Sequence, residues 1–310
     1  MTAKEAIEAK IRGLETIPQT WVDSITGFQP RMAARFTRIL SGLTTTSSGA
    51  IEMTAANLAA IDGLLLEMQT WMTQSEYIDI VSTLSNEFAG QQATTMAYFQ
   101  TVFDAPAPVT TFAAELYQVG RLQLINDLIP ENLTTWLWQP LRETLTNAIA
   151  TGAGYTELLD SVQLIAQGGE GVDGYLMRYS RVVVSDTLAT TDRAFTNIVA
   201  NDLGLEWYRY LGGRINTTRC FCNKRNGGYF HKNEIKGWGS GIGVGECGYP
   251  WAGMNKGTNS ETIFAYVGGY NCQHSLLPVS EFDVPREAAI KAIEAGWYKP
   301  GKTAKAHFKV

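Results

Sequence analysis

Charged side chains are scarce in this chain of 310 residues. Asp, Glu, Lys and Arg together make up 18% of it, below the roughly 25% of an ordinary soluble domain. A surface with few charges is typical of a protein that packs against partners, and it also fits the many Thr, Ser, Asn and Gln residues. The net charge of −5 argues against nucleic-acid binding by the chain as a whole, because such binding needs clustered Lys and Arg.

Long apolar runs are also missing. No run of about 18 apolar residues occurs, so we expect no helix that spans a membrane. The first fifteen residues, MTAKEAIEAKIRGLE, have the pattern of an amphipathic helix with mixed charges and lack the apolar centre of a signal peptide. We therefore expect the protein to be made and used in the cytosol, or in something assembled there.

Histidine is rare, with only His231, His274 and His307. No Ser-His-Asp arrangement can be built around them with confidence in its geometry, and no pair of carboxylates stands out from the helical patterns. The sequence therefore predicts a protein that is not an enzyme.

In residues 1–202 the apolar side chains recur at the spacing of helices. Within 56–72, for example, the apolar side chains recur at steps of three and four residues; they are Leu58, Ile61, Leu65, Met68 and Met72. A long helix is predicted from about Gly174 to Leu203. Apolar stripes of this kind are typical of a core or of contacts between subunits.

Residues 203–280 have a different composition. This stretch holds fifteen of the thirty glycines, all four cysteines and two of the three histidines. Short apolar pieces such as WYRYLGG, TIFAYVGG and HSLLPVS are strand-like or irregular and are bounded by glycine or polar residues. We predict an α+β fold in which a mainly helical N-terminal domain (1–174) precedes a small glycine-rich α+β module (175–280), followed by a C-terminal helix and basic tail (281–310).

Two short pairs of metal-binding side chains lie about fifty residues apart in this module. They are Cys220-Phe-Cys222 and Cys272-Gln-His274, and paired thiolate and imidazole ligands are the usual way to build a zinc site. If Cys220–Cys222 is an extended strand, both thiols point to the same face. His231 and Cys247 are further candidate ligands. A structural Zn²⁺ would stabilise a module with so little core.

Other roles for these side chains stay open. Reduced Cys and His packed in a small core explain the same residues without a metal, and so does a disulfide or a reactive thiol. No other cofactor is indicated.

Basic residues suggest two further sites. Near the C-terminus, Lys299, Lys302, Lys305 and Lys309 form either a local contact with nucleic acid or a solvated tail. A nuclease-like cluster could be built from a histidine base and nearby cations that stabilise a phosphorane; its members would be His231, Lys232, Arg214, Arg219 and Arg225.

Several segments of the glycine-rich module resemble the C-terminal module of the phage Mu protein F-like family. The likeness covers about residues 175–280 and includes Thr218–His231, Glu234–Trp238, Tyr249–Gly253, Gly257–Phe264 and Gly268–Pro278. The sequence GGYNCQH is similar to the typical ending of the family, which is proline or glycine, then Asn, Cys, Arg and Cys or His. Many members carry an Asp-x-x-His-type segment where this chain has Arg219–Cys222. The residues to which the family's pattern transfers first are Cys222, Cys272 and His274.

The resemblance implies a minor head protein of a tailed bacteriophage. Such a protein is a virion component that associates with the portal or the major capsid protein, in the head interior or at the portal vertex. It implies a role in head morphogenesis and in genome packaging or ejection, with a local contact to packaged DNA and none to a membrane. Two alternatives are a nuclease-like or toxin-like effector enzyme delivered with the phage genome, and a zinc-stabilised binding module.

Overall fold

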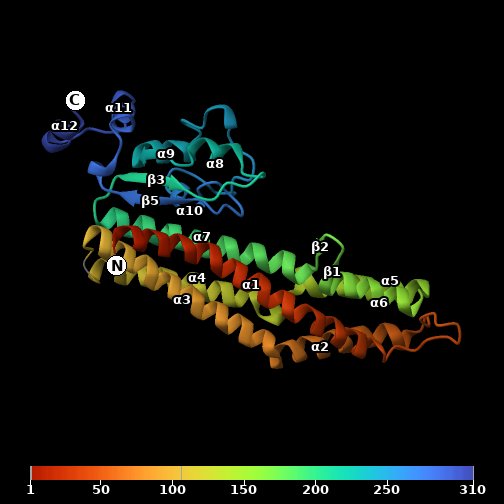
Figure 1. The fold of residues 1–310 in the computed structure, drawn as a ribbon. Coiled ribbons are helices and arrows are strands. Elements are labelled where there is room, and N and C mark those ends of the chain that lie inside the picture. The colour runs from red at the N-terminus through yellow and green to blue at the C-terminus, as the bar shows by residue number, and fades with distance from the viewer. Residues whose placement is uncertain (1, 106, 310) are drawn as a thin grey trace. The chain divides into compact units, whose positions relative to one another are not determined.

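The computed structural model describes residues 2–105 and 107–309; for residues 3 and 107–113 it describes the backbone only. It is 68% helical and 7% strand, which confirms the predicted mainly helical α+β fold. The helices of the first 202 residues are α1 (Ala3–Leu40), α2 (Ala55–Gln74), α3 (Glu76–Phe103), α4 (Ala107–Leu128), α5 (Gln139–Thr151), α6 (Tyr155–Gln167) and α7 (Tyr175–Asp202) (Figure 1).

Contacts divide the chain into two compact units. Unit 1 consists of Met1–Glu15, Ala89–Gly120 and Ser185–Val310, and unit 2 consists of Thr16–Phe88 and Arg121–Val184. The long helices α1, α3, α4 and α7 each contribute a segment to both units. The ranges predicted from the sequence (1–174, 175–280 and 281–310) divide the chain at other positions, because they follow its composition, whereas the units follow its contacts.

Unit 2 is a set of helices around an apolar core. The period predicted for α2 is confirmed at four of its five positions, since Ile61, Leu65, Met68 and Met72 are buried. The fifth, Leu58, is exposed, and the neighbouring Asn57 is buried at that end of the helix. Two polar groups in the core are also paired: the Trp21 indole donates to the Ser180 hydroxyl over 2.9 Å, and the Tyr77 hydroxyl donates to a backbone carbonyl of α4 over 2.6 Å. Both of these buried polar groups therefore have a hydrogen-bond partner, as buried polar groups usually do.

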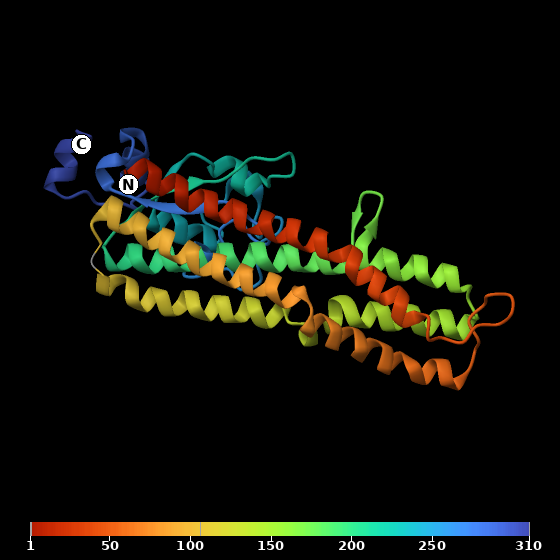
Figure 2. The same cartoon turned by 60° about the horizontal axis from the view of Figure 1, so that its bottom comes forward.

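Shorter elements complete unit 2. Two helical turns, η1 (Pro130–Asn132) and η2 (Thr134–Trp138), precede α5. Proline stands at the start of η1, where its missing N–H is not needed. A two-residue hairpin of β1 (Gly168–Gly169) and β2 (Val172–Asp173) projects between α6 and α7, as Figure 2 shows.

The helical segments of unit 1 are joined by a buried polar network. The Lys10 ammonium on α1 contacts a carboxylate oxygen of Asp192 on α7 at 2.5 Å, and both side chains are almost completely buried. Hydroxyl groups of Thr95 and Thr196 add further hydrogen bonds. A buried charge pair with these partners fixes which faces of the three helices meet.

The glycine-rich part of unit 1 is built on a three-stranded antiparallel sheet. Its strands are β3 (Trp207–Leu211), β4 (Tyr229–His231) and β5 (Ser275–Val279), in the order β4-β3-β5. Two of the three predicted strand-like pieces are therefore strands, β3 and β5. The third is a single helical turn, α10 (Ile263–Tyr266). The remaining elements here are α8 (Cys220–Arg225), α9 (Lys232–Gly239) and η3 (Gly245–Cys247).

An aromatic core holds this module together. Tyr208 and Tyr210 of β3 pack with Phe221, Trp238 and Trp251 in one buried cluster that also contains Cys222 and Cys272. Phe221 and Trp251 stack with ring centroids 4.1 Å apart. Large aromatic side chains bury much area per residue, and this compensates for the many glycines.

The C-terminal segment packs as well. It contains η4 (Glu281–Asp283), α11 (Arg286–Glu294) and α12 (Lys302–Phe308). Part of the segment predicted as a basic tail is therefore a helix, because Ala304 and Phe308 are buried in a second cluster with Trp207. One apolar side chain per turn was too sparse a signal to predict α12 from the sequence.

Candidate metal centre

The first predicted ligand pair lies on a helix rather than on a strand. Cys220, Phe221 and Cys222 form the first turn of α8, where residues two apart point about 200° from each other. Cys222 is buried and Cys220 is exposed. The expectation that both thiols share one face is therefore wrong.

Cys220 has a different partner. It forms a disulfide with Cys247 of η3, with 5.6 Å between the two Cα atoms. The disulfide joins α8 to the glycine-rich segment that follows α9. Cys220 and Cys247 are thus removed from the candidate ligands, and Cys222 and Cys272 are the free cysteines.

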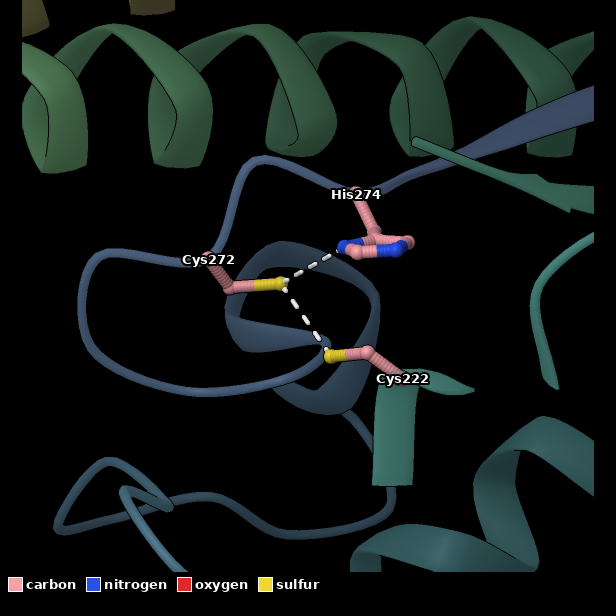
Figure 3. Close-up of side chains that lie close together, drawn as sticks. All are labelled: Cys222, Cys272 and His274. Atoms are coloured by element: carbon pink, nitrogen blue, oxygen red, sulfur yellow. Dashed lines mark hydrogen bonds between the residues drawn. The ribbon is translucent and has the colours of Figure 1, made fainter. Parts of the chain in front are cut away.

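Three of the predicted ligands do meet. The sulfur atoms of Cys222 and Cys272 are 3.7 Å apart, and the Cys272 sulfur is 3.9 Å from Nδ1 of His274. All three donor atoms lie within 4.8 Å of one another, and all three residues are buried. Figure 3 shows the three side chains converging from α8 and from the turn before β5.

Helix α7 holds that turn in place. Arg193, which is buried, donates from its guanidinium to the carbonyl of Cys272, and it also reaches the carbonyl of Ala265. The carboxylate of Asp186 accepts the backbone N–H of Asn271. The backbone of Asn271 is left-handed, with φ of 53°, a conformation that Asn tolerates better than most residues. Neither Arg193 nor Asp186 was predicted from the sequence to hold this turn.

Two glycines permit the close approach of the three ligands. A Cβ atom at Gly268 would lie 2.4 Å from the sulfur of Cys222 and 2.6 Å from that of Cys272, and one at Gly212 would lie 2.5 Å from Cγ of His274. These separations are far inside contact distance. The space beside the centre is therefore available only to glycine.

The pKa values of the two thiols are shifted in opposite directions. The hydrogen bond from Cys222 holds the pKa of Cys272 well below its usual range, helped by His274 and by the charge of Arg193. The same hydrogen bond, together with burial, raises the pKa of Cys222. The Tyr210 hydroxyl donates to the Cys222 sulfur over 3.2 Å. Of the two sulfurs, that of Cys272 is therefore the one whose deprotonated form the surroundings favour.

A cavity of about 240 Å³ adjoins the centre. Its lining includes the three ligands and the segment before α8. Several residues of this lining are exposed, among them Ile215, Thr217 and Gln273, so solvent reaches the cavity. Arg219 borders it and donates to the carbonyls of Gly268 and Tyr270, which ties α8 to the loop that carries Cys272.

His231 lies apart from this centre. Its ring packs between Trp207 and Tyr298, with centroids 5.2 and 5.3 Å away. Nδ1 accepts the N–H of Asn233 and caps the start of α9, and Nε2 is 3.6 Å from a carboxylate oxygen of Glu206. Burial lowers the pKa of His231, although Glu206 opposes this. His231 is thus a capping and core residue here, and not one of the clustered ligands.

The cations of the predicted nuclease-like cluster are each engaged elsewhere. Arg225 is buried, lies over the rings of Phe221 and Trp238, and donates to two carbonyls. Lys232 pairs with Glu206 at 2.6 Å, and Arg214 donates to carbonyls at the end of α8. Their contacts are those of residues that hold loops and helices together.

The four C-terminal lysines are on the surface. Lys302 and Lys305 lie on α12, Lys309 follows it and Lys299 precedes it, and all four are exposed. No ion pair links any of them to another described side chain. Their ammonium groups are therefore available to a partner, as the sequence predicts, but the contact with nucleic acid stays a prediction.

Comparison of the chain with family models, with curated proteins and with solved structures finds no match. Within residues 2–105 and 107–309, no helix is both long enough and apolar enough to cross a membrane.

Proposed function

We propose that this chain is a minor head protein of a tailed bacteriophage, similar to the phage Mu protein F-like family, and that it acts as a structural virion component and not as an enzyme. The observation that carries the proposal is where the structure places the residues on which the resemblance depends. Cys272 and His274 of the GGYNCQH ending lie with Cys222, far away in the chain, in one buried centre. A likeness that marks the centre of a compact module supports a shared fold better than scattered identities would.

Unit 2 supplies the surface that such a protein needs for docking. Its exposed large apolar side chains are Met53, Leu58, Leu66, Leu122, Trp136, Leu164, Val172 and Val182. Single exposed apolar side chains are ordinary, whereas several that lie together mark a contact surface, and Trp136 and Val182 do lie together. The low charge content of the chain supports the same conclusion.

One part of that surface is hollow. A cavity of about 490 Å³ is lined by Trp136 of η2 and by Tyr175, Tyr179, Val182 and other residues of α7. Trp136 stacks on Tyr179 with ring centroids 4.9 Å apart and remains half exposed. We call this the Trp136 hollow. An apolar side chain of a portal or capsid helix is the partner that fits it, in the manner of helix-in-groove recognition.

Contact with DNA is local in this proposal. The exposed lysines at 299, 302, 305 and 309 lie together at the C-terminal end of an otherwise acidic chain. Phosphate contacts by a few lysines give weak, salt-dependent binding without sequence preference. That suits a protein that lies beside packaged DNA.

The proposal is tested by finding whether a portal gene neighbours the gene of this chain and expressing that portal protein together with the chain. We expect the two to purify as one complex. The Trp136→Ser variant should weaken the complex, and Ile242→Ser, at an apolar position of unit 1 that is at least as exposed, should not. Free chain in every fraction, with a folded portal protein present, would count against the proposal.

A further inference from the structure

Three soft donor atoms converge on one point in unit 1, next to a cavity that solvent can enter. We propose that Sγ of Cys222, Sγ of Cys272 and Nδ1 of His274 bind one Zn²⁺ ion, and that its fourth ligand is a water molecule that enters from the adjoining cavity. The inference concerns these residues alone and does not rest on the proposed virion role.

The distances fit a tetrahedral ion. With Zn–S bonds of about 2.3 Å, two thiolates on one zinc lie about 3.8 Å apart, and a thiolate and an imidazole nitrogen lie about 3.5 Å apart. The observed separations are 3.7 Å between the sulfurs and 3.9 Å from the Cys272 sulfur to Nδ1. The third separation, from the Cys222 sulfur to the imidazole, is at most 4.8 Å, so binding of the ion draws the imidazole toward that sulfur.

The chemistry of the donors selects the metal. Two thiolates and a neutral imidazole favour zinc over Mg²⁺ and Ca²⁺, which prefer oxygen ligands. Two thiolate charges also neutralise the ion, so the complex carries no net charge where all three residues are buried. Since Cys220 and Cys247 are joined to each other, Cys222 and Cys272 are the cysteines left to bind it.

The surroundings are shaped for close packing of the donors. Gly268 lies against both sulfurs, and Gly212 lies against the imidazole, at positions where any Cβ would collide. Arg193 and Arg219 hold the ligand loop through its carbonyls and leave the donor atoms themselves facing one another. A preformed ligand set lowers the cost of ordering when the ion binds.

The protein supplies three ligands and not four. Among the described residues, no further Cys, His, Asp or Glu joins the group. A cavity of about 240 Å³ reaches all three ligands and has exposed residues in its lining. Three protein ligands with an exchangeable fourth position distinguish such a site from a closed structural site.

Metal analysis tests the ligand set. The full chain is produced with zinc in the medium, purified without chelators and analysed by mass spectrometry of the metal. We expect about one equivalent of zinc in the wild type, less than a tenth of that in Cys272→Ser and His274→Gln, and full occupancy in the double variant Cys220→Ser/Cys247→Ser. Circular dichroism shows whether each variant is folded.

Two results would overturn the inference. One is a folded wild-type chain without zinc after supplementation, and the other is a Cys222–Cys272 disulfide in the same preparation. If the ligand variants do not fold, cobalt bound to the wild type replaces them as the test. Thiolate-to-cobalt charge-transfer absorption and the intense visible bands of a tetrahedral ion are expected, and their absence would contradict the site.

The open position has its own test. Added imidazole should change the visible bands of the cobalt protein, because it displaces the water ligand. Bands that stay the same up to high imidazole concentration would exclude an exchangeable fourth ligand.

Discussion

At the scale of single residues, Gly212 and Gly213 differ in what surrounds them. A Cβ at Gly212 would collide with His274, whereas one at Gly213 meets nothing within 4 Å. We expect Gly212→Ala to lower the free energy of unfolding by about 1–3 kcal/mol through overpacking. Gly213→Ala should change it by less than about 0.5 kcal/mol. Urea denaturation of the two variants measures both, and equal effects would show that the close packing around His274 is not formed.

Protonation of His231 makes the stability of the fold depend on pH. Because burial lowers its pKa below the usual 6.5, the unfolded chain takes up a proton more readily than the folded chain as the pH falls. Stability is then fully present above about pH 6.5 and decreases below it. Glu206, which faces His231, and Lys232, which pairs with Glu206, are the neighbouring charges.

The His231→Gln variant isolates this effect. We expect its free energy of unfolding to change less than that of the wild type between pH 6.5 and about 5.5. Urea denaturation at several pH values gives the two slopes. Parallel slopes would mean that other groups cause the acid dependence.

The residues of the centre show what a sequence can and cannot predict. Thiol and imidazole chemistry, with the family likeness, identified Cys222, Cys272 and His274. The disulfide partner of Cys220 could not be assigned, because it depends on the path of the glycine-rich segment before Cys247. Tyr210 and Arg193 gave no signal, since an aromatic residue in a strand and a cation in a helix are ordinary. Glycine pairs at 212–213 and 268–269 were visible, but only the fold shows that two of these glycines touch the ligands.

At the scale of elements, helices were predicted well because their periodicity extends over many residues. The predicted helix from Gly174 to Leu203 is α7, Tyr175–Asp202. Short elements were predicted poorly. Six residues of α8 contain too few turns for a period. Arg225 lies over Phe221 within the helix and over Trp238 of α9; the second contact is tertiary, and tertiary contacts override local propensity.

The buried pair on α1 and α7 permits a prediction about these elements. Lys10→Met leaves the Asp192 carboxylate buried without its partner, so we expect a loss of about 3–5 kcal/mol in the free energy of unfolding. The double variant Lys10→Met/Asp192→Leu should recover most of that loss, because no unpaired charge remains. Denaturation of the two single variants and the double variant gives the coupling energy. Additive effects would contradict the described pairing.

At the scale of the whole molecule, composition separated a helical part from a glycine-rich part but did not place the units. Helices α1, α3, α4 and α7 run through both units, and no local signal in the sequence marks the point where their contacts change. The exposed apolar side chains of unit 2 are likewise hidden in sequence, because an apolar stripe looks the same whether it faces a core or a partner.

The nuclease alternative is tested directly on the purified chain. Since Arg225 is engaged with carbonyls and Lys232 with Glu206, we expect no cleavage of RNA or DNA above the background of the His231→Ala/His274→Ala variant. Fluorescent oligonucleotides with Mg²⁺ or Zn²⁺ provide a sensitive assay. Cleavage that disappears in this variant would establish an enzyme.

The most direct test of the proposed function is quantitative mass spectrometry of phage particles, purified on a density gradient from lysates of the bacterium that carries this gene. We predict that the chain sediments with intact heads at a small fraction of the major capsid protein copy number, and that Trp136→Ser reduces its incorporation. Recovery of the chain only as free protein, outside the particle fractions, would contradict the account.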